Sequence, residues 1–193
     1  MTGSSESTVA HTKIFMTTRR LYFRIWQADD LDLAMDLWGD PEVTRFIVAK
    51  GQMSDDEVKA RLFKEIDSQK NHGIQYWPCF LKSNSNPVGC CGIRPYQPSK
   101  RIYEIGFHIL RRCWGKGFAV EMALGVMAYA FKEISVAGLF AGHHPDNTAS
   151  PHVLERLGFE YTHHEYYEPT GLQHPSYILN REAYSICLGG RGR

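Results

Sequence analysis

Three absences limit what this chain of 193 residues is expected to do. It has no uninterrupted run of about 18 apolar residues, so no membrane-spanning helix is expected. It also has no long block of one charge. Lys and Arg number 22, Asp and Glu 21, and the formal charge is +1, which argues against a broad nucleic-acid surface. With 43% hydrophobic and 22% charged residues, the composition is typical of one ordinary globular domain.

Paired cysteine spacing is missing as well. The five cysteines show no Cys-x-x-Cys pattern, and two of them are adjacent in an apolar run. They are Cys79, Cys90, Cys91, Cys113 and Cys187. An odd count without paired spacing indicates reduced thiols. Residues 1–18 are rich in Ser and Thr and lack the apolar core of a signal peptide. We therefore expect a cytoplasmic protein with no membrane anchor.

The first third of the chain predicts a strand followed by helices. Residues 19–25 alternate and are rich in β-formers. Apolar residues then recur at helical spacing up to Trp38, and Pro41 begins another short turn or helix. Ser54-Asp-Asp-Glu57 has the form of a capping box, and the apolar stripe that follows predicts a helix to about Gln69.

The middle of the chain predicts an antiparallel meander. Residues 74–82 and 88–93 are β-prone and flank a dense turn signal, which is typical of a hairpin. Residues 101–110 predict a third strand. A regular pleat would place Glu104, Gly106 and His108 of that strand on one face.

Later segments predict a switch to parallel pairing. Residues 119–134 form an apolar helical pattern, and the short strand expected at 138–142 would return beside the third strand of the meander. A further helix is expected with Pro151 in its first turn and Gly158 at its C-cap, followed by closing strands at 161–167 and 174–180.

A glycine turn, Arg112-x-x-Gly115-x-Gly117, lies between the last meander strand and the long helix. Glycines let the backbone approach a bulky anion, and the amides and dipole of the helix start point at it, so the turn suits a diphosphate. The alternative is an ordinary helix-capping turn. The position does not match the Rossmann fingerprint, and no P-loop motif exists.

The sequence resembles the GCN5-related N-acetyltransferase (GNAT) superfamily, and within it the ribosomal-protein N-terminal acetyltransferases of the RimJ/RimL type. The resemblance runs from about residue 18 to 184. It is carried by Leu37-Trp-Gly-Asp-Pro-Glu-Val43, Pro87-Val-Gly-Cys-Cys-Gly92, Glu104-Ile-Gly-Phe107, Trp114-Gly-Lys-Gly-Phe-Ala119 with Glu121, Asn147-Thr-Ala-Ser150, Leu154-Glu-Arg-Leu-Gly-Phe159 and Tyr177-Ile-Leu-Asn-Arg-Glu-Ala-Tyr184.

The resemblance implies an α+β GNAT fold of αβα layers. Its sheet would be mixed, mostly antiparallel and twisted, with splayed strands 4 and 5 and helices on both faces. The expected organisation is a flexible tail over 1–17, a single acetyltransferase domain over 18–185 and a flexible C-terminal tail over 186–193.

The implied cofactor is acetyl-CoA, lying between the two splayed strands with its pyrophosphate on the amides of residues 113–119. Asn147 would reach the pantetheine arm, and Ser150 would approach the thioester sulfur. Both residues would equally suit N-capping of the helix that follows. The expected cofactor-binding residues are Ile109, Leu110, Arg112, Cys113, Trp114, Gly115, Lys116, Gly117, Phe118, Ala119, Asn147 and Ser150.

The implied reaction is direct attack of a neutral primary amine on the thioester, which needs a base and an acid. Glu104 is the first candidate base, with a surface or ion-paired carboxylate as the alternative. His108 is the second, although a packing role suits it better, and a water chain is the third. Leu154 stands where many superfamily members have an acid Tyr, which leaves Ser150 as the candidate acid.

The acceptor remains open between a protein N-terminal α-amine, suggested by the subfamily, and a small amine such as a polyamine, aminoglycoside or amino acid. A catalytically silent CoA-binding sensor is the alternative from another class. His144, His163 and the tyrosines of 161–177 are candidates to line an acceptor pocket, while the histidine pairs lack familiar metal-ligand spacing. No nucleic-acid or membrane partner is expected, and the chain should be a monomer or weak homodimer.

Overall fold

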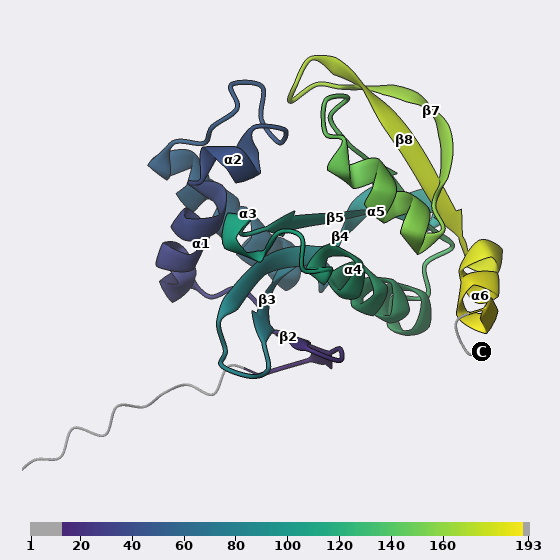
Figure 1. Ribbon diagram of the computed structural model, residues 1–193, viewed down its shortest axis with the longest axis horizontal. Helices are drawn as coiled ribbons and strands as arrows, with labels where there is room; N and C mark the ends of the chain where they lie inside the picture. Colours follow the sequence, from purple (N-terminus) through teal and green to yellow (C-terminus); the bar gives the residue numbers. More distant parts are fainter. Residues whose placement is uncertain (1–12, 191–193) are drawn as a thin grey trace, which may run out of the picture.

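The computed structural model describes residues 13–190, which fold around one eight-stranded sheet (Figure 1). The strands are β1 (Met16–Thr17), β2 (Leu21–Phe23), β3 (Tyr76–Leu81), β4 (Pro87–Gln97), β5 (Ile102–Ile109), β6 (Gly138–Gly142), β7 (Glu160–Tyr167) and β8 (Leu172–Asn180). Their order in the sheet is β1-β2-β3-β4-β5-β6-β8-β7. The α-helices are α1 (Leu31–Trp38), α2 (Pro41–Thr44), α3 (Asp55–His72), α4 (Phe118–Tyr129), α5 (Ala149–Leu157) and α6 (Arg181–Gly190).

The predicted meander is confirmed, since β3, β4 and β5 pair antiparallel in sequence order. Strand β4 is longer than the expected 88–93 because a β-bulge between Pro95 and Gln97 lets pairing continue to Gln97. A bulge leaves its extra residue outside the ladder and redirects that side chain. The redirected residue is Tyr96, which reappears below in the candidate active site.

The expected splay is also confirmed. Strands β5 and β6 pair parallel, but only where Ile102–Glu104 meets Gly138–Phe140. Beyond that point β5 runs on to Ile109 paired only with β4, and β6 runs on to Gly142 paired only with β8. Glu104 is therefore the last residue of β5 that pairs with β6, at the base of the opening between the two strands.

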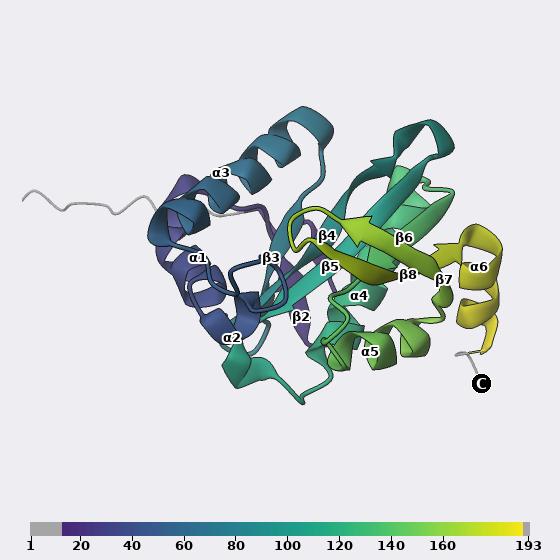
Figure 2. The same cartoon turned by 90° about the horizontal axis from the view of Figure 1, so that it is seen from above.

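Helices cover both faces of the sheet, with α1 and α3 on one side and α4 and α5 on the other (Figure 2). The capping box of α3 forms as predicted, since Ser54 accepts from the Glu57 amide and the Glu57 carboxylate accepts from the Ser54 amide. This helix continues past the expected Gln69 to His72, where Gly73 ends it at a φ of 70°. Helix α4 stops at Tyr129, and a π-helical turn continues to Ile134. No helix of the described chain combines the length and apolarity needed to cross a bilayer.

Regular structure extends beyond residues 18 and 185, the expected limits of the domain. Met16 pairs with Phe23 and Thr17 with Tyr22, so the sheet begins before residue 18. At the other end, helix α6 extends through 186–190. A two-residue strand depends on its partner and leaves no pattern of its own, whereas Asn180, which accepts from the Ala183 amide at 2.8 Å, was an available N-cap signal for α6. Residues 1–12 and 191–193 lie outside the described chain.

Two strands approach so closely at Gly92 that no side chain fits there. A Cβ at this position would lie 1.8 Å from the backbone oxygen of Gln75 on the neighbouring strand segment. We expect Gly92→Ala to lower the free energy of unfolding by about 3 kcal/mol or more, because backbone atoms must separate to admit the methyl group. Chemical denaturation would measure this loss. Gly142→Ala is the matched control, since its nearest atom would lie at an ordinary 3.6 Å, and a loss equal to that of Gly92→Ala would contradict the explanation.

Candidate active site

The glycine turn leads from β5 into α4 at one end of a cleft of about 690 Å³. Gly115 and Gly117 both adopt a φ of 73°, a left-handed conformation that disfavours other residues. A Cβ at Gly115 would meet no protein atom within 4 Å, so this side of the turn faces open space. Among the described residues, the amides of residues 115–117 have no hydrogen-bond partner. The first amides of α4 add further free donors, so the turn can bind an anion.

The side chain of Arg20, directly before β2, contacts this turn. Its guanidinium donates to the Lys116 carbonyl at 3.1 Å and to the Glu121 carboxylate at 2.6 Å, and it lies 4.3 Å from the centre of the Phe118 ring. Glu121 also accepts from the Thr18 hydroxyl and the Arg20 amide, both at 2.7 Å. The N-terminal strands thus fix the conformation of the glycine turn.

The start of α5 lies across the opening from the end of β5. Asn147 accepts a hydrogen bond from the Ser150 amide at 3.2 Å, so its capping role is present. Both residues also line the cleft, and the two expected roles are compatible. The Ser150 hydroxyl has no hydrogen-bond partner within the described chain. Leu154 lines the cleft one turn further along and is buried.

Glu104 lines the cleft where the strands begin to splay. It accepts a hydrogen bond from the Tyr76 hydroxyl at 3.3 Å. Tyr76 is buried, and burial raises its pKa well above the usual value of 10, so this hydroxyl stays protonated and can only donate to a carboxylate. Gly106 makes room for it, because a Cβ there would lie 2.2 Å from the Tyr76 oxygen.

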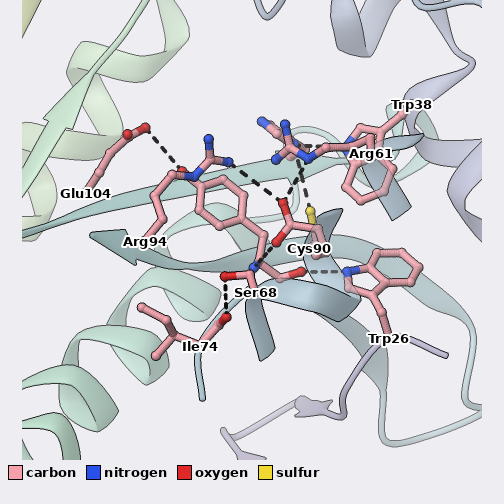
Figure 3. A network of polar contacts seen from close by, with 11 residues as sticks. Trp26, Trp38, Arg61, Ser68, Ile74, Cys90, Arg94 and Glu104 are labelled. Atoms are coloured by element: carbon pink, nitrogen blue, oxygen red, sulfur yellow. Dashed lines mark hydrogen bonds and ion pairs between the residues drawn. The ribbon is translucent and has the colours of Figure 1, made fainter. Parts of the chain in front are cut away.

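A buried ionic network supports Tyr76 from the other side (Figure 3). The Glu65 carboxylate accepts from the Tyr76 amide at 2.7 Å and from Arg61 at 2.8 Å. Arg94 lies 3.8 Å from Glu65 and 4.2 Å from the centre of the Tyr76 ring. The two arginines share the Glu65 carboxylate, and Glu104, the register partner of Arg94 on β5, supplies a second negative charge nearby. The ion pairs and the amide bond can hold Tyr76 in place beside Glu104.

His108 shares the face of Glu104 and Gly106, as predicted, and also lines the cleft. Its Nδ1 accepts from the Trp38 indole at 3.0 Å, so the neutral ring carries its proton on Nε2. Burial, followed by the charges of Arg61 and Arg94, lowers the pKa of His108 well below 6.5. With its lone pair already engaged, this imidazole suits packing better than proton abstraction.

Aromatic side chains dominate the far end of the cleft. Tyr96, turned by the β4 bulge, stacks on Phe140 with ring centres 3.9 Å apart and donates to Glu165 at 2.6 Å. Tyr167 packs on His174 at 4.8 Å. His143 and His144 line the same cleft, whereas His163 does not. Within the described chain, no three His, Cys, Asp or Glu side chains come together as a metal site.

His174 should make stability depend on pH. Burial, with smaller contributions from His144 and His143, lowers its pKa from 6.5 to about 4. Between these values the unfolded chain binds the proton and the folded chain does not, so stability is complete above pH 6.5 and falls as the pH falls towards 4. We expect the loss due to His174 to be on the order of 1–2 kcal/mol after solvent screening. Urea unfolding at several pH values in this range should show that the free energy of unfolding falls less steeply with decreasing pH in His174→Gln. The same pH dependence in both proteins would contradict the role of His174.

The structure brings together most of the predicted site residues. Those lining the cleft are Glu104, Ile109, Cys113, Trp114, Gly115, Gly117, Phe118, Ala119, Asn147 and Ser150. Three predicted side chains lie elsewhere. Leu110 is buried, its amide bonded to the Val88 carbonyl, while Arg112 forms a bidentate pair with Asp36 and Lys116 donates to the Arg112 carbonyl. Fewer amides are free to bind the pyrophosphate than expected, because the Cys113 amide donates to the Leu110 carbonyl and the Trp114 amide to the Arg111 carbonyl.

Sequence reasoning missed the residues around Glu104. Tyr76, Tyr96, Phe140 and His174 come from four different strands, and no local pattern connects them. The one available signal was the Pro95-Tyr96 pair near a strand end, which is consistent with a bulge. Of the aromatic group expected at the acceptor end, Tyr166 and Tyr167 line the cleft with Glu165, while Tyr161 and Tyr177 do not.

A free anion-binding turn, splayed strands and a carboxylate at their fork define a cofactor-dependent group-transfer enzyme. Comparison with known proteins refines this class. Residues 20–160 match the acetyltransferase (GNAT) domain family. An uncharacterized N-acetyltransferase, p20, of Bacillus licheniformis is 27% identical over 143 residues, which is 74% of this chain and 80% of that protein. The uncharacterized protein YkkB of Bacillus subtilis is 29% identical over 154 residues, or 79% and 88% of the two chains.

Solved structures share the fold. An acetyltransferase of the GNAT family from Bacillus anthracis has a TM-score of 0.74 and 24% identity over 88% of this chain and 99% of that one. RimL, a ribosomal L7/L12 alpha-N-protein acetyltransferase solved in complex with coenzyme A, has a TM-score of 0.74 and 15% identity over 89% and 99%.

The chain therefore belongs to the GNAT acetyltransferase family. The expected enzyme class, an N-acetyltransferase, is confirmed, as are the α+β GNAT fold and acetyl-CoA as the acetyl donor that this family uses. The free amides of the glycine turn and the open space at Gly115 fit the diphosphate of that donor.

Proposed function

We propose that this protein transfers the acetyl group of acetyl-CoA to a primary amine, with Glu104 as the base and Ser150 as the acid. The observation that carries the proposal is the single cleft that joins the glycine turn to Glu104. One end suits the diphosphate of the cofactor, and the other holds a carboxylate beside aromatic walls. When bound, acetyl-CoA supplies the thioester carbonyl that the amine attacks.

In this proposal the cofactor is held by the backbone of the glycine turn. The amides of residues 115–117 and the first turn of α4 bind the pyrophosphate, and Arg20 keeps the turn in shape. Asn147 and Ile109 line the route of the pantetheine arm. The side chains of Arg112 and Lys116 are not needed for it, because both bond elsewhere.

Glu104 accepts the proton of the attacking amine. Because Tyr76 donates to Oε1, the second oxygen of Glu104 has no hydrogen bond among the described residues and is available. Ser150 then passes a proton to the leaving thiolate as the C–S bond breaks and regains one from solvent in the same step, so that the hydroxyl is restored. Its unpartnered hydroxyl and its place at the start of α5 support this role. No tyrosine competes for this role on α5, since Leu154 occupies the corresponding place.

The acceptor is proposed to be a protein N-terminal α-amine or a small monoamine. The names of RimL-type structural neighbours support the first. One observation supports the second: the Ala49 amide donates to the Pro169 carbonyl at 3.0 Å, which joins the loop after α2, where Phe46 and Ile47 line the cleft, to the β7–β8 turn. A cytoplasmic, monomeric or weakly dimeric protein is part of the proposal, and the reduced state of Cys79, Cys90, Cys91 and Cys113 supports the location.

Calorimetric titration with acetyl-CoA, followed by thiol release in the presence of peptides and small amines, tests this proposal. We expect binding, and thiol release that depends on the amine and matches acetylated product by mass spectrometry. Binding without amine-dependent release would favour a CoA-binding sensor. Absence of binding would contradict the proposal as a whole.

A further inference from the structure

We propose that the acceptor end of the cleft selects a primary amine with a single positive charge, carried on a short chain next to an aromatic ring. This inference rests on the proposed function and specifies its substrate. The ring could belong to a small arylalkylamine or to the first residue of a peptide, since both present the same chemistry.

The first wall of this site is the stacked pair of Tyr96 and Phe140. Phe140 is the register partner of Glu104 in the β5–β6 ladder, so its ring lies beside the carboxylate on the same face of the sheet. The bulge in β4 brings Tyr96 across β5 to stack on it, with an angle of 4° between the rings. Glu165 of β7 accepts from the Tyr96 hydroxyl at 2.6 Å and fixes that ring. The result is a rigid flat surface adjoining the base.

The β7–β8 hairpin contributes a second aromatic group. Tyr167 lines the cleft and packs against His174, whose Nε2 lies 2.7 Å from the Thr170 hydroxyl. Burial first, and then the negative charge of Glu104, raises the pKa of Tyr167, so this phenol stays neutral. Tyr167 thus adds a neutral ring to the cleft that Glu104 lines.

Charge at this end suits one ammonium and no more. Glu42 pairs with Arg45 at 3.3 Å, and Glu165 is engaged by Tyr96. Glu104 keeps one oxygen without a hydrogen bond among the described residues, and Arg94, its register partner on β4, offsets part of its charge. A polyamine would bring a second or third ammonium with no carboxylate to meet it. Ring faces, by contrast, attract a single cation and pack on a flat apolar group.

The flat wall also disfavours a broad polar acceptor. A molecule such as an aminoglycoside would place hydroxyl groups against the faces of Tyr96 and Phe140, which offer them no hydrogen-bond partner. A flat ring on a short chain places no hydroxyl group there.

The test compares kcat/KM for phenethylamine, butylamine and spermidine, and for two peptides of equal length that begin with Phe or Ser. We expect phenethylamine to exceed butylamine and spermidine, and the Phe peptide to exceed the Ser peptide, each by about tenfold or more. Preference in the small amines alone would identify an arylalkylamine, and preference in the peptides alone would identify an aromatic N-terminus. Both outcomes support the inference.

Substitutions of Tyr96 and Phe140 test whether these rings cause the preference for an aromatic amine. Tyr96→Leu and Phe140→Leu should each lower the ratio of phenethylamine to butylamine by about tenfold while leaving the affinity for acetyl-CoA unchanged. Tyr96→Phe keeps the ring and should keep most of the ratio, so it remains informative even if a Leu variant fails to fold. Tyr161→Leu is the matched control, because Tyr161 is exposed and does not line the cleft.

Acetylation of all amines without an aromatic preference would overturn this inference and leave the proposed function standing. An unchanged ratio of phenethylamine to butylamine in both Tyr96→Leu and Phe140→Leu would also overturn the inference. If no amine is acetylated, the proposed function fails, and the inference fails with it.

Discussion

Replacing Gly117 with Trp is expected to reduce the affinity for acetyl-CoA by about a hundredfold or more, to the point where calorimetry detects no binding. Gly117 lines the cleft at the start of α4, where its φ of 73° directs the free amides of the turn towards open space. An indole at this position would occupy the space that the diphosphate needs. The Cβ itself would make only an ordinary contact, 3.8 Å from Nη2 of Arg20, so the expected loss comes from the bulk of the indole.

Two controls separate the loss of the anion site from backbone strain. Gly73 has a φ of 70° and equally open surroundings, but it ends α3 away from the cleft. Gly73→Trp should therefore carry a similar conformational cost, of about 1 kcal/mol, and retain the affinity for acetyl-CoA. Gly117→Ala adds strain without bulk and should weaken binding by about tenfold at most. Unchanged affinity in Gly117→Trp would refute the position of the diphosphate site.

The sequence was sufficient for those features that depend on local patterns. The turn of Gly115 and Gly117 was visible because positive φ and helix starts favour glycine, and the common face of Glu104, Gly106 and His108 follows from the two-residue period of a strand. The splay was expected only through the resemblance to a family. Nothing in the spacing of β5 and β6 alone shows that their pairing stops at Glu104.

The sequence was not sufficient for contacts between strands that are distant along the chain. Tyr76 and Glu104 are 28 residues apart, and Tyr96 and Glu165 are 69 apart. Such pairs depend on register, and the register of β4 depends on a bulge whose position the sequence did not reveal. The partner of Arg112 is a further example. Its place in the glycine motif indicated a cofactor contact, and the sequence did not reveal its pair with Asp36 of α1, 76 residues away.

These distant contacts explain why the carboxylate at the fork is suited to catalysis. The buried network of Glu65, Arg61 and Arg94 holds Tyr76, and Tyr76 orients Glu104 through one oxygen. A base held in this way loses little rotamer entropy when the amine arrives. The orientation of the base therefore depends on α3 and β3. Glu65 and Arg61 of α3 act through Tyr76 and do not themselves contact the acceptor.

Replacing Glu104 with Gln is expected to lower kcat by about 10²–10⁴-fold, because the amide keeps the shape of the side chain and an acceptor for Tyr76 but cannot take up a proton. The affinity for acetyl-CoA should stay unchanged, since the glycine turn is untouched. Raising the pH should narrow the deficit, because a larger fraction of the amine is then already neutral. Steady-state thiol release from pH 6 to about pH 10, near the usual pKa of an alkylamine, would measure both effects.

Tyr76→Phe and Glu133→Gln serve as controls for this result. Removing the Tyr76 hydroxyl takes away only the orienting hydrogen bond, which is worth about 1 kcal/mol, so kcat should fall by roughly fivefold and still respond to pH as in the unmodified protein. Glu133 is exposed and does not line the cleft, so its amide variant should be fully active. If Glu104→Gln keeps the original kcat while Gly117→Trp loses binding, the cofactor site is correct and the proton leaves the amine through water rather than through Glu104.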